Sequence, residues 1–103
     1  METIHRLKPK GCYEKKLKKV MLDIKICAIP STSWYSLAIK FEDHLFLKDG
    51  TLESLLYDSR DFFNKHNLKA FKSKKDILKN ATLVKLVGPS TDENVQKALG
   101  VQA

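Results

Sequence analysis

The stretch from Trp34 to Lys65, WYSLAIKFEDHLFLKDGTLESLLYDSRDFFNK, contains the two patterns that decide the fold. From Trp34 to Phe41, alternate residues are apolar, which is the period of a β-strand. After Thr51, apolar residues recur every three or four positions, which is the period of an α-helix. One compact stretch therefore predicts both strand and helix. The strand residues expected on one face are Tyr35, Leu37, Ile39 and Phe41.

A second strand follows the first closely. The polar turn Glu42-Asp43-His44 leads into Leu45-Phe46-Leu47-Lys48, so the two strands are predicted to form a hairpin. The dipeptide Asp49-Gly50 is typical of a turn and is expected to end the hairpin.

The helix after the hairpin has clear signals at both ends. Thr51 is a good N-cap and Glu53 lies in the first turn, while Lys65 lies in the last turn and favours the negative end of the helix dipole. Asn67 is a plausible left-handed residue at the end. The predicted buried stripe consists of Leu52, Leu55, Leu56, Ser59, Phe62 and Phe63.

Before the hairpin, the sequence predicts one strand and one ambiguous segment. Val20–Ile29 alternates with a period of two and is rich in β-branched residues, which favours a strand. Gly11–Lys19 fits either a short helix or the lead-in to a strand.

After the long helix, shorter elements are expected. Leu68–Phe71 is predicted as a short strand, and Ser73 with Asp76 three positions later predicts a short capped helix through Asn80. Thr82–Val87 is predicted as a strand, and in one arrangement it runs parallel to Leu68–Phe71. A last helix is expected to begin after Thr91 and to end at Gly100.

Together these elements predict an α+β fold. We expect a small mixed or antiparallel sheet of about four to five strands, with two or three helices packed mainly on one face. The length of 103 residues suits one domain. We assign residues 11–103 to that domain and residues 1–10 to a flexible basic arm.

Composition narrows the class of protein. No apolar run approaches the roughly 18 residues of a membrane span, and the first residues lack the apolar core of a secretory signal. Cys12 and Cys27 are expected to be reduced thiols. These features predict a cytoplasmic protein without membrane association.

Positive charge is concentrated in two parts of the chain, whose net charge is +7. Residues 1–25 contain eight basic and three acidic residues, and residues 64–87 contain seven lysines and one acid. Only Arg6 and Arg60 are arginines, and lysine favours phosphate contact over the reading of base edges. The two blocks indicate a polyanion or an acidic protein surface as partner.

Motifs for catalysis or cofactor binding are missing from the sequence. The four glycines are isolated, so no phosphate-cradling loop is formed. His5, His44 and His66 are far apart in sequence and are expected to be solvated rather than metal ligands. Cys27 is expected to be a half-buried thiol. We therefore predict no enzyme, no cofactor and no metal site.

The leading hypothesis is a small, non-enzymatic, basic binding domain that contacts nucleic-acid phosphate, DNA or RNA, with weak sequence specificity. Aromatic residues near the lysines could stack on bases or contact a partner. The lysines assigned to this surface are Lys15, Lys16, Lys18, Lys19, Lys69, Lys72, Lys74, Lys75 and Lys79, and the aromatic residues are Tyr13, Trp34 and Phe71.

The alternative hypothesis is a protein-interaction module, such as a small regulator or inhibitor from a phage or another mobile element. It would dock on an acidic partner or associate with itself as a homodimer. This alternative predicts a contiguous apolar patch around Trp34 or along an unpaired strand edge.

Overall fold

The computed structural model describes the backbone of residues 13–16 and all atoms of residues 22–101. The predicted arm at residues 1–10 lies outside these ranges. The strands are β1 (Tyr13–Lys16), β2 (Asp23–Ala28), β3 (Trp34–Phe41), β4 (His44–Thr51) and β5 (Thr82–Val84). The helices are α1 (Leu52–Lys65), α2 (Lys74–Lys79) and α3 (Asp92–Leu99). Within the described ranges, no helix combines the length and the apolar character needed to cross a bilayer.

The strands form one mixed sheet in the order β1-β4-β3-β2-β5. Strands β1 to β4 pair in antiparallel fashion, and the β3–β4 hairpin has the register Ile39 opposite Phe46. Strand β5 pairs with β2 in parallel, with Leu83 opposite Ile26. The segment 13–16 is therefore a strand, which decides between the two structures that the sequence left open.

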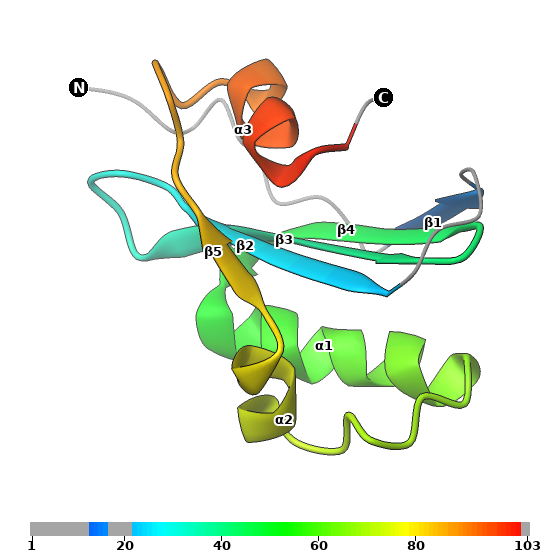
Figure 1. Cartoon of the computed structure of the whole chain (residues 1–103). Helices are drawn as coiled ribbons and strands as arrows, with labels where there is room; N and C mark the ends of the chain where they lie inside the picture. Colours follow the sequence, from blue (N-terminus) through cyan, green and yellow to red (C-terminus); the bar gives the residue numbers. More distant parts are fainter. Residues whose placement is uncertain (1–12, 17–21, 102–103) are drawn as a thin grey trace.

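Both faces of the sheet are covered, as Figure 1 shows: α1 and α2 lie below the sheet and α3 lies above it. Central strand β3 is buried on both faces because its side chains alternate. Leu37 and Ile39 belong to the core beneath α1, and Ala38 belongs to the core beneath α3. The α+β class, the small mixed sheet and the packing of helices mainly on one face are confirmed.

Two hydrophobic clusters result from this arrangement. The α1-side core consists of Ile24, Ile26, Leu37, Ile39, Phe46, Leu55, Leu56, Phe62, Phe63 and Ile77. The α3-side core consists of Cys27, Ile29, Ala38, Leu45, Leu47, Val95, Leu99 and Val101.

The ends of the helices form as their sequences predict. The Thr51 side chain accepts a hydrogen bond from the Ser54 backbone N–H, and Asn67 follows α1 in the left-handed conformation. Thr91 caps α3 in the same way. Gly100 ends α3 with φ of 75°, and its carbonyl accepts a hydrogen bond from Lys40 Nζ at 2.9 Å.

Three local predictions are wrong or too long. Asp49-Gly50 is part of β4 rather than a turn, because strand pairing with β3 continues to Thr51. Segment 68–71 forms turns rather than a strand, because its apolar side chains pack beneath the sheet. Strand β5 ends at Val84 and does not reach Val87.

Phe63 is fully buried in the α1-side core, where its ring stacks on Phe71. We expect Phe63→Ala to lower the free energy of unfolding by about 3–5 kcal/mol, since it removes a buried ring and leaves a cavity. Chemical denaturation of the full chain measures this change. Tyr57 on the same helix is 67% exposed, so Tyr57→Ala is the matched control, with an expected change within about 0.5 kcal/mol. Equal effects of the two substitutions would contradict this packing.

Candidate nucleic-acid interface

The segment between α1 and β5 is held against the protein by apolar side chains. Leu68, Phe71 and Ala81 pack against the α1-side core, and Ile77 of α2 is fully buried within it. The rings of Phe71 and Phe63 are stacked, with centroids 4.6 Å apart and planes 15° apart. This anchoring gives the polar side chains of the segment a defined surface. It also places Phe71 in the core, so we leave it out of the interface.

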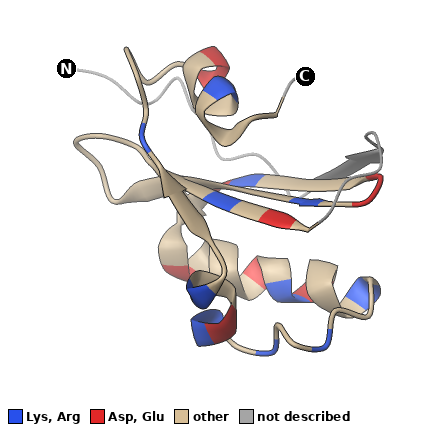
Figure 2. Cartoon of the chain, viewed as in Figure 1, with Lys and Arg blue, Asp and Glu red and all other residues tan. Residues whose placement is uncertain are grey.

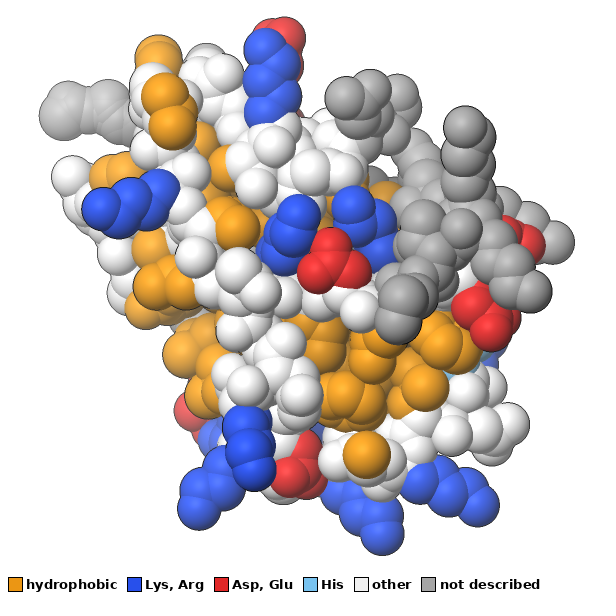
Figure 3. Space-filling view, in the orientation of Figure 1, with side chains coloured by type: hydrophobic (Ala, Val, Ile, Leu, Met, Phe, Trp, Pro, Cys, Tyr) orange, Lys and Arg blue, Asp and Glu red, His pale blue; other side chains and the backbone are white. Residues whose placement is uncertain are grey.

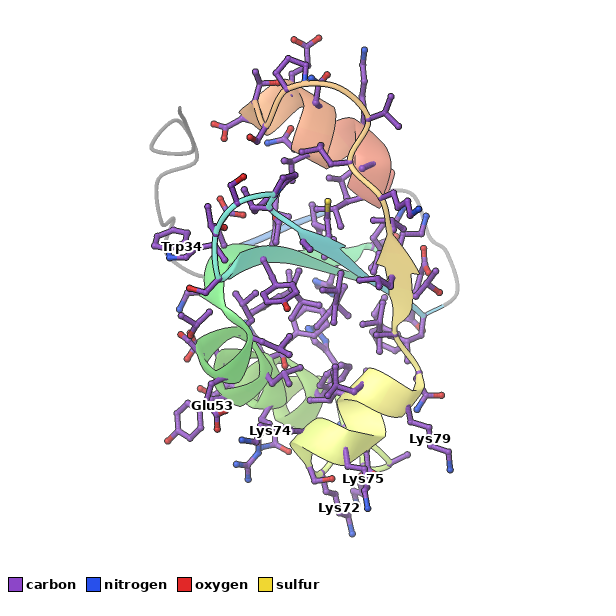
Figure 4. The ribbon with its side chains drawn as sticks, turned by 90° about the vertical axis from the view of Figure 1, so that its left-hand side faces the viewer. Trp34, Glu53, Lys72, Lys74, Lys75 and Lys79 are labelled. Carbon is purple, nitrogen blue, oxygen red and sulfur yellow. The ribbon has the colours of Figure 1, made fainter. Side chains whose placement is uncertain are left out.

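Lysines alternate with these anchors and point outward. Residues 69–80 contain five lysines and one acid. Figure 4 shows Lys72 and Lys75 directed away from the protein, with Lys79 on the same side of α2. Lys79 lies four positions after Lys75, which places both on one side of the helix. We call this surface the lysine face, and its members, all exposed, are Lys69, Lys72, Lys74, Lys75 and Lys79.

The acidic groups close to the lysine face already have partners. Lys74 Nζ pairs with the Glu53 carboxylate on α1, which draws Lys74 toward α1 (Figure 4). The Ser73 hydroxyl donates a hydrogen bond to Asp76 Oδ2 at 3.0 Å and accepts one from the Asp76 N–H. Lys72, Lys75 and Lys79 have no salt bridge among the described residues. Their charge is available to an external anion.

The first basic block lies elsewhere in the fold. Strand β1, which contains Tyr13, Lys15 and Lys16, is at the edge of the sheet opposite β5 (Figure 1). Helix α2 leads directly into β5 and lies beneath that edge. Lys18 and Lys19 are outside the described residues. The interface we describe is therefore built from the second block alone.

Trp34 does not join the lysine face. It begins β3, is half-buried, and packs against the α3-side core. Figure 4 shows its ring far from the lysine labels, beyond the sheet from α2. Trp34 therefore belongs partly to the core, and it does not provide the stacking platform next to these lysines that we expected from the sequence.

A shallow pocket of about 350 Å³ adjoins the lysine face and supplies an aromatic ring that the sequence analysis overlooked. Lys74 is shared by both surfaces. Tyr57 is exposed, and the Arg60 guanidinium carbon lies 5.9 Å from the centre of its ring. In the sequence, Tyr57 and Arg60 are recognisable only as positions on the solvent-facing side of a helix. The pocket is lined by Thr51, Glu53, Ser54, Tyr57, Arg60 and Lys74.

The charges are unevenly distributed on the side of the sheet that α1 and α2 cover, as Figure 2 shows. Lysines are frequent on α2 and on the loop before it, while basic and acidic residues are mixed on α1. One such mixed pair is Lys48 with Asp58 of α1. The lysine face is thus the described surface with the least compensated positive charge.

Two histidines that were expected to be solvated instead form a cluster. The His44 and His66 rings lie with centroids 4.4 Å apart, and both side chains are half-buried. The His66 ring also lies 4.5 Å from that of Phe62 and 5.7 Å from that of Phe41. Residues 44 and 66 are brought together because α1 runs back along β4 to the start of that strand. Within residues 22–101, no group of three or more potential ligands could hold a metal ion.

A buried polar pair between β3 and β4 was also missed. The Ser36 hydroxyl donates a hydrogen bond of 2.6 Å to Asp49 Oδ1, and both residues are buried. They occupy opposite positions in the strand register. This contact explains why an acidic residue and the following glycine continue a strand here. Its place inside the sheet gives it a structural role.

Cys27 is fully buried beneath α3, rather than half-buried. Burial raises the pKa of its thiol, because removal from water disfavours the thiolate. A nucleophilic cysteine needs the opposite shift and access to substrate. The site of Cys27 therefore favours an inert core thiol.

In a Cys12→Ser chain, we expect a thiol reagent to modify Cys27 slowly in the folded protein, because the reagent has to wait for the protein to open. After denaturant is added, the reaction should be fast.

The raised pKa also predicts how stability depends on pH. Because the folded-state pKa of Cys27 exceeds that of the unfolded chain, the neutral thiol contributes its full stability below about pH 8.5, and this contribution is lost as pH rises. Denaturation across this pH range, with Cys27→Ala as control, measures the loss. Rapid labelling of the native chain would contradict the buried position.

No family model, curated protein or solved structure is found to match this chain.

Proposed function

We propose that the protein binds nucleic acid through the lysine face, with contacts mainly to phosphate and with weak sequence specificity. The observation that carries the proposal is the presence on one anchored surface of three lysines, Lys72, Lys75 and Lys79, that have no salt bridge to the part of the chain that the structure describes. Each phosphate contact made by these lysines releases counterions from the nucleic acid. Lysine rather than arginine favours this kind of contact.

The pocket beside the lysine face supports a preference for single strands. Tyr57 presents an exposed ring, and Arg60 adds charge next to it. Unpaired bases stack on such rings, whereas the bases of a duplex are already stacked. A single strand following the lysine face past Lys74 would reach this ring, because Lys74 also lines the pocket.

Binding to labelled oligonucleotides of mixed sequence, single-stranded and duplex, tests the lysine face. For four phosphate contacts, affinity is expected to fall about 100-fold between about 50 mM and about 200 mM salt. Lys72→Glu with Lys75→Glu should weaken binding at low salt by at least about tenfold, since two attractive contacts become repulsive.

The matched control for this experiment is Lys85→Glu with Lys97→Glu, which changes the net charge equally at exposed positions outside the lysine face. Equal losses for the two double variants would assign binding to overall charge. Absence of binding at low salt would refute the proposed function.

Tyr57→Ala tests the stacking contact separately. We expect it to lower the affinity for the single-stranded oligonucleotide about tenfold, because one base loses its stacking partner, and to leave duplex affinity unchanged. The same binding assay measures both values. Tyr57→Phe retains the ring and serves as control. An equal loss for single strand and duplex would show that Tyr57 acts through the fold or the local charge.

A further inference from the structure

Exposed apolar residues gather along one edge of the sheet. Among the described residues, four large hydrophobic side chains are exposed, and three of them lie between residues 78 and 87. Their exposed fractions are 42% for Leu78, 71% for Leu83 and 82% for Val87. Figure 3 shows hydrophobic surface on the side of the molecule where β5 lies. Exposed apolar side chains that gather on one side of a protein mark an interaction surface more often than single scattered ones do.

Strand β5 is also an open edge. It is the last strand in the sheet order and pairs only with β2. Among the described residues, no element pairs with its outer side. Its outward N–H and C=O groups can therefore form hydrogen bonds with one more extended chain. Charged side chains, proline and bulges are among the features that protect edge strands, and Thr82–Val84 contains neither charge nor proline.

Charge decides between a second copy of this chain and a different partner. Residues 77–91 contain Lys79 and Lys85 and no acid. Antiparallel pairing of two β5 strands about Leu83 would place Lys85 of each copy opposite Ala81 of the other, two positions from Lys79, and would add like charge with no acid to offset it. Acidic residues at those positions would instead be attracted to both lysines. The charge of the edge therefore selects a chain with acidic side chains.

We infer that the outer edge of β5 docks an extended segment of an acidic partner protein, which adds to the sheet as a further strand. Its backbone pairs with β5, its apolar side chains cover Leu83 and Val87, and its carboxylates face Lys79 and Lys85. This surface is distinct from the nucleic-acid contacts proposed above, although Lys79 borders both.

A blocked hexapeptide of alternating valine and glutamate is the probe. We expect its addition to the ¹⁵N-labelled full chain to shift backbone amide signals of residues 80–87 and to slow amide exchange in β5. The same peptide with every backbone nitrogen methylated has equal charge but no N–H group to donate along either edge. It should bind at least about tenfold more weakly.

Substitutions separate apolar contact from charge. Leu83→Lys adds positive charge but removes an apolar contact, and it should weaken peptide binding about tenfold. Val87→Lys should act in the same direction, and both positions are exposed enough to spare the fold. Asn64→Lys is the control because it adds the same charge at an exposed position on α1, away from β5.

Three results would overturn the inference. One is equal binding of the N-methylated peptide with shifts centred on the lysine face, which would show attraction by charge alone. Another is absence of signal changes in residues 80–87 at millimolar peptide. The third is sedimentation of the free chain as a dimer that Leu83→Lys converts to a monomer, which would make a second copy the occupant. None of these results depends on nucleic-acid binding.

Discussion

The rest of the structure depends on the burial of β3 on both faces. The side chains of a central strand alternate between the two faces of the sheet, and the apolar side chains on each face have to be buried by another element. Leu37 and Ile39 are covered by α1, while Ser36 and Ala38 lie on the side of α3. Helix α3 therefore has to return to the opposite side of the sheet from α1. The chain makes that return through β5, which adds a parallel strand to an otherwise antiparallel sheet.

This path of the chain from α1 through β5 to α3 explains how both proposed surfaces arise. The segment between α1 and β5 has to run beneath the sheet, and it is held there by Phe71 and Ile77. Because Leu68, Phe71 and Ile77 face inward, the lysines between them face water. Strand β5 then has only three residues, enough to redirect the chain but too few to form a wide, protected edge. One topological requirement thus produces an ordered lysine face and an open strand next to it.

The elements with local signals were predictable from the sequence. Thr51 and Thr91 cap their helices, and Phe62 and Phe63 are buried in the stripe that the helical period indicated. Predictions failed where a distant contact overrides a local preference. Asp49-Gly50 is typical of a turn, but the hydrogen bond from Ser36 and the pairing with β3 keep it in a strand. The His44–His66 contact joins residues far apart in sequence, so no spacing rule could reveal it.

In the candidate site, too, only the features with a local sequence signal were predictable. Charge counting located the second lysine block, but it could not show that Phe71 is part of the core or that β1 lies at the opposite edge. It also could not distinguish Tyr57 from any other residue on the outer side of α1, because exposure depends on what packs nearby. The distance between such groups matters, because an aromatic ring and a lysine can contribute to binding the same ligand only when that ligand reaches both. In this fold, Lys74 provides that connection, since it pairs with Glu53 and lines the same pocket as Tyr57.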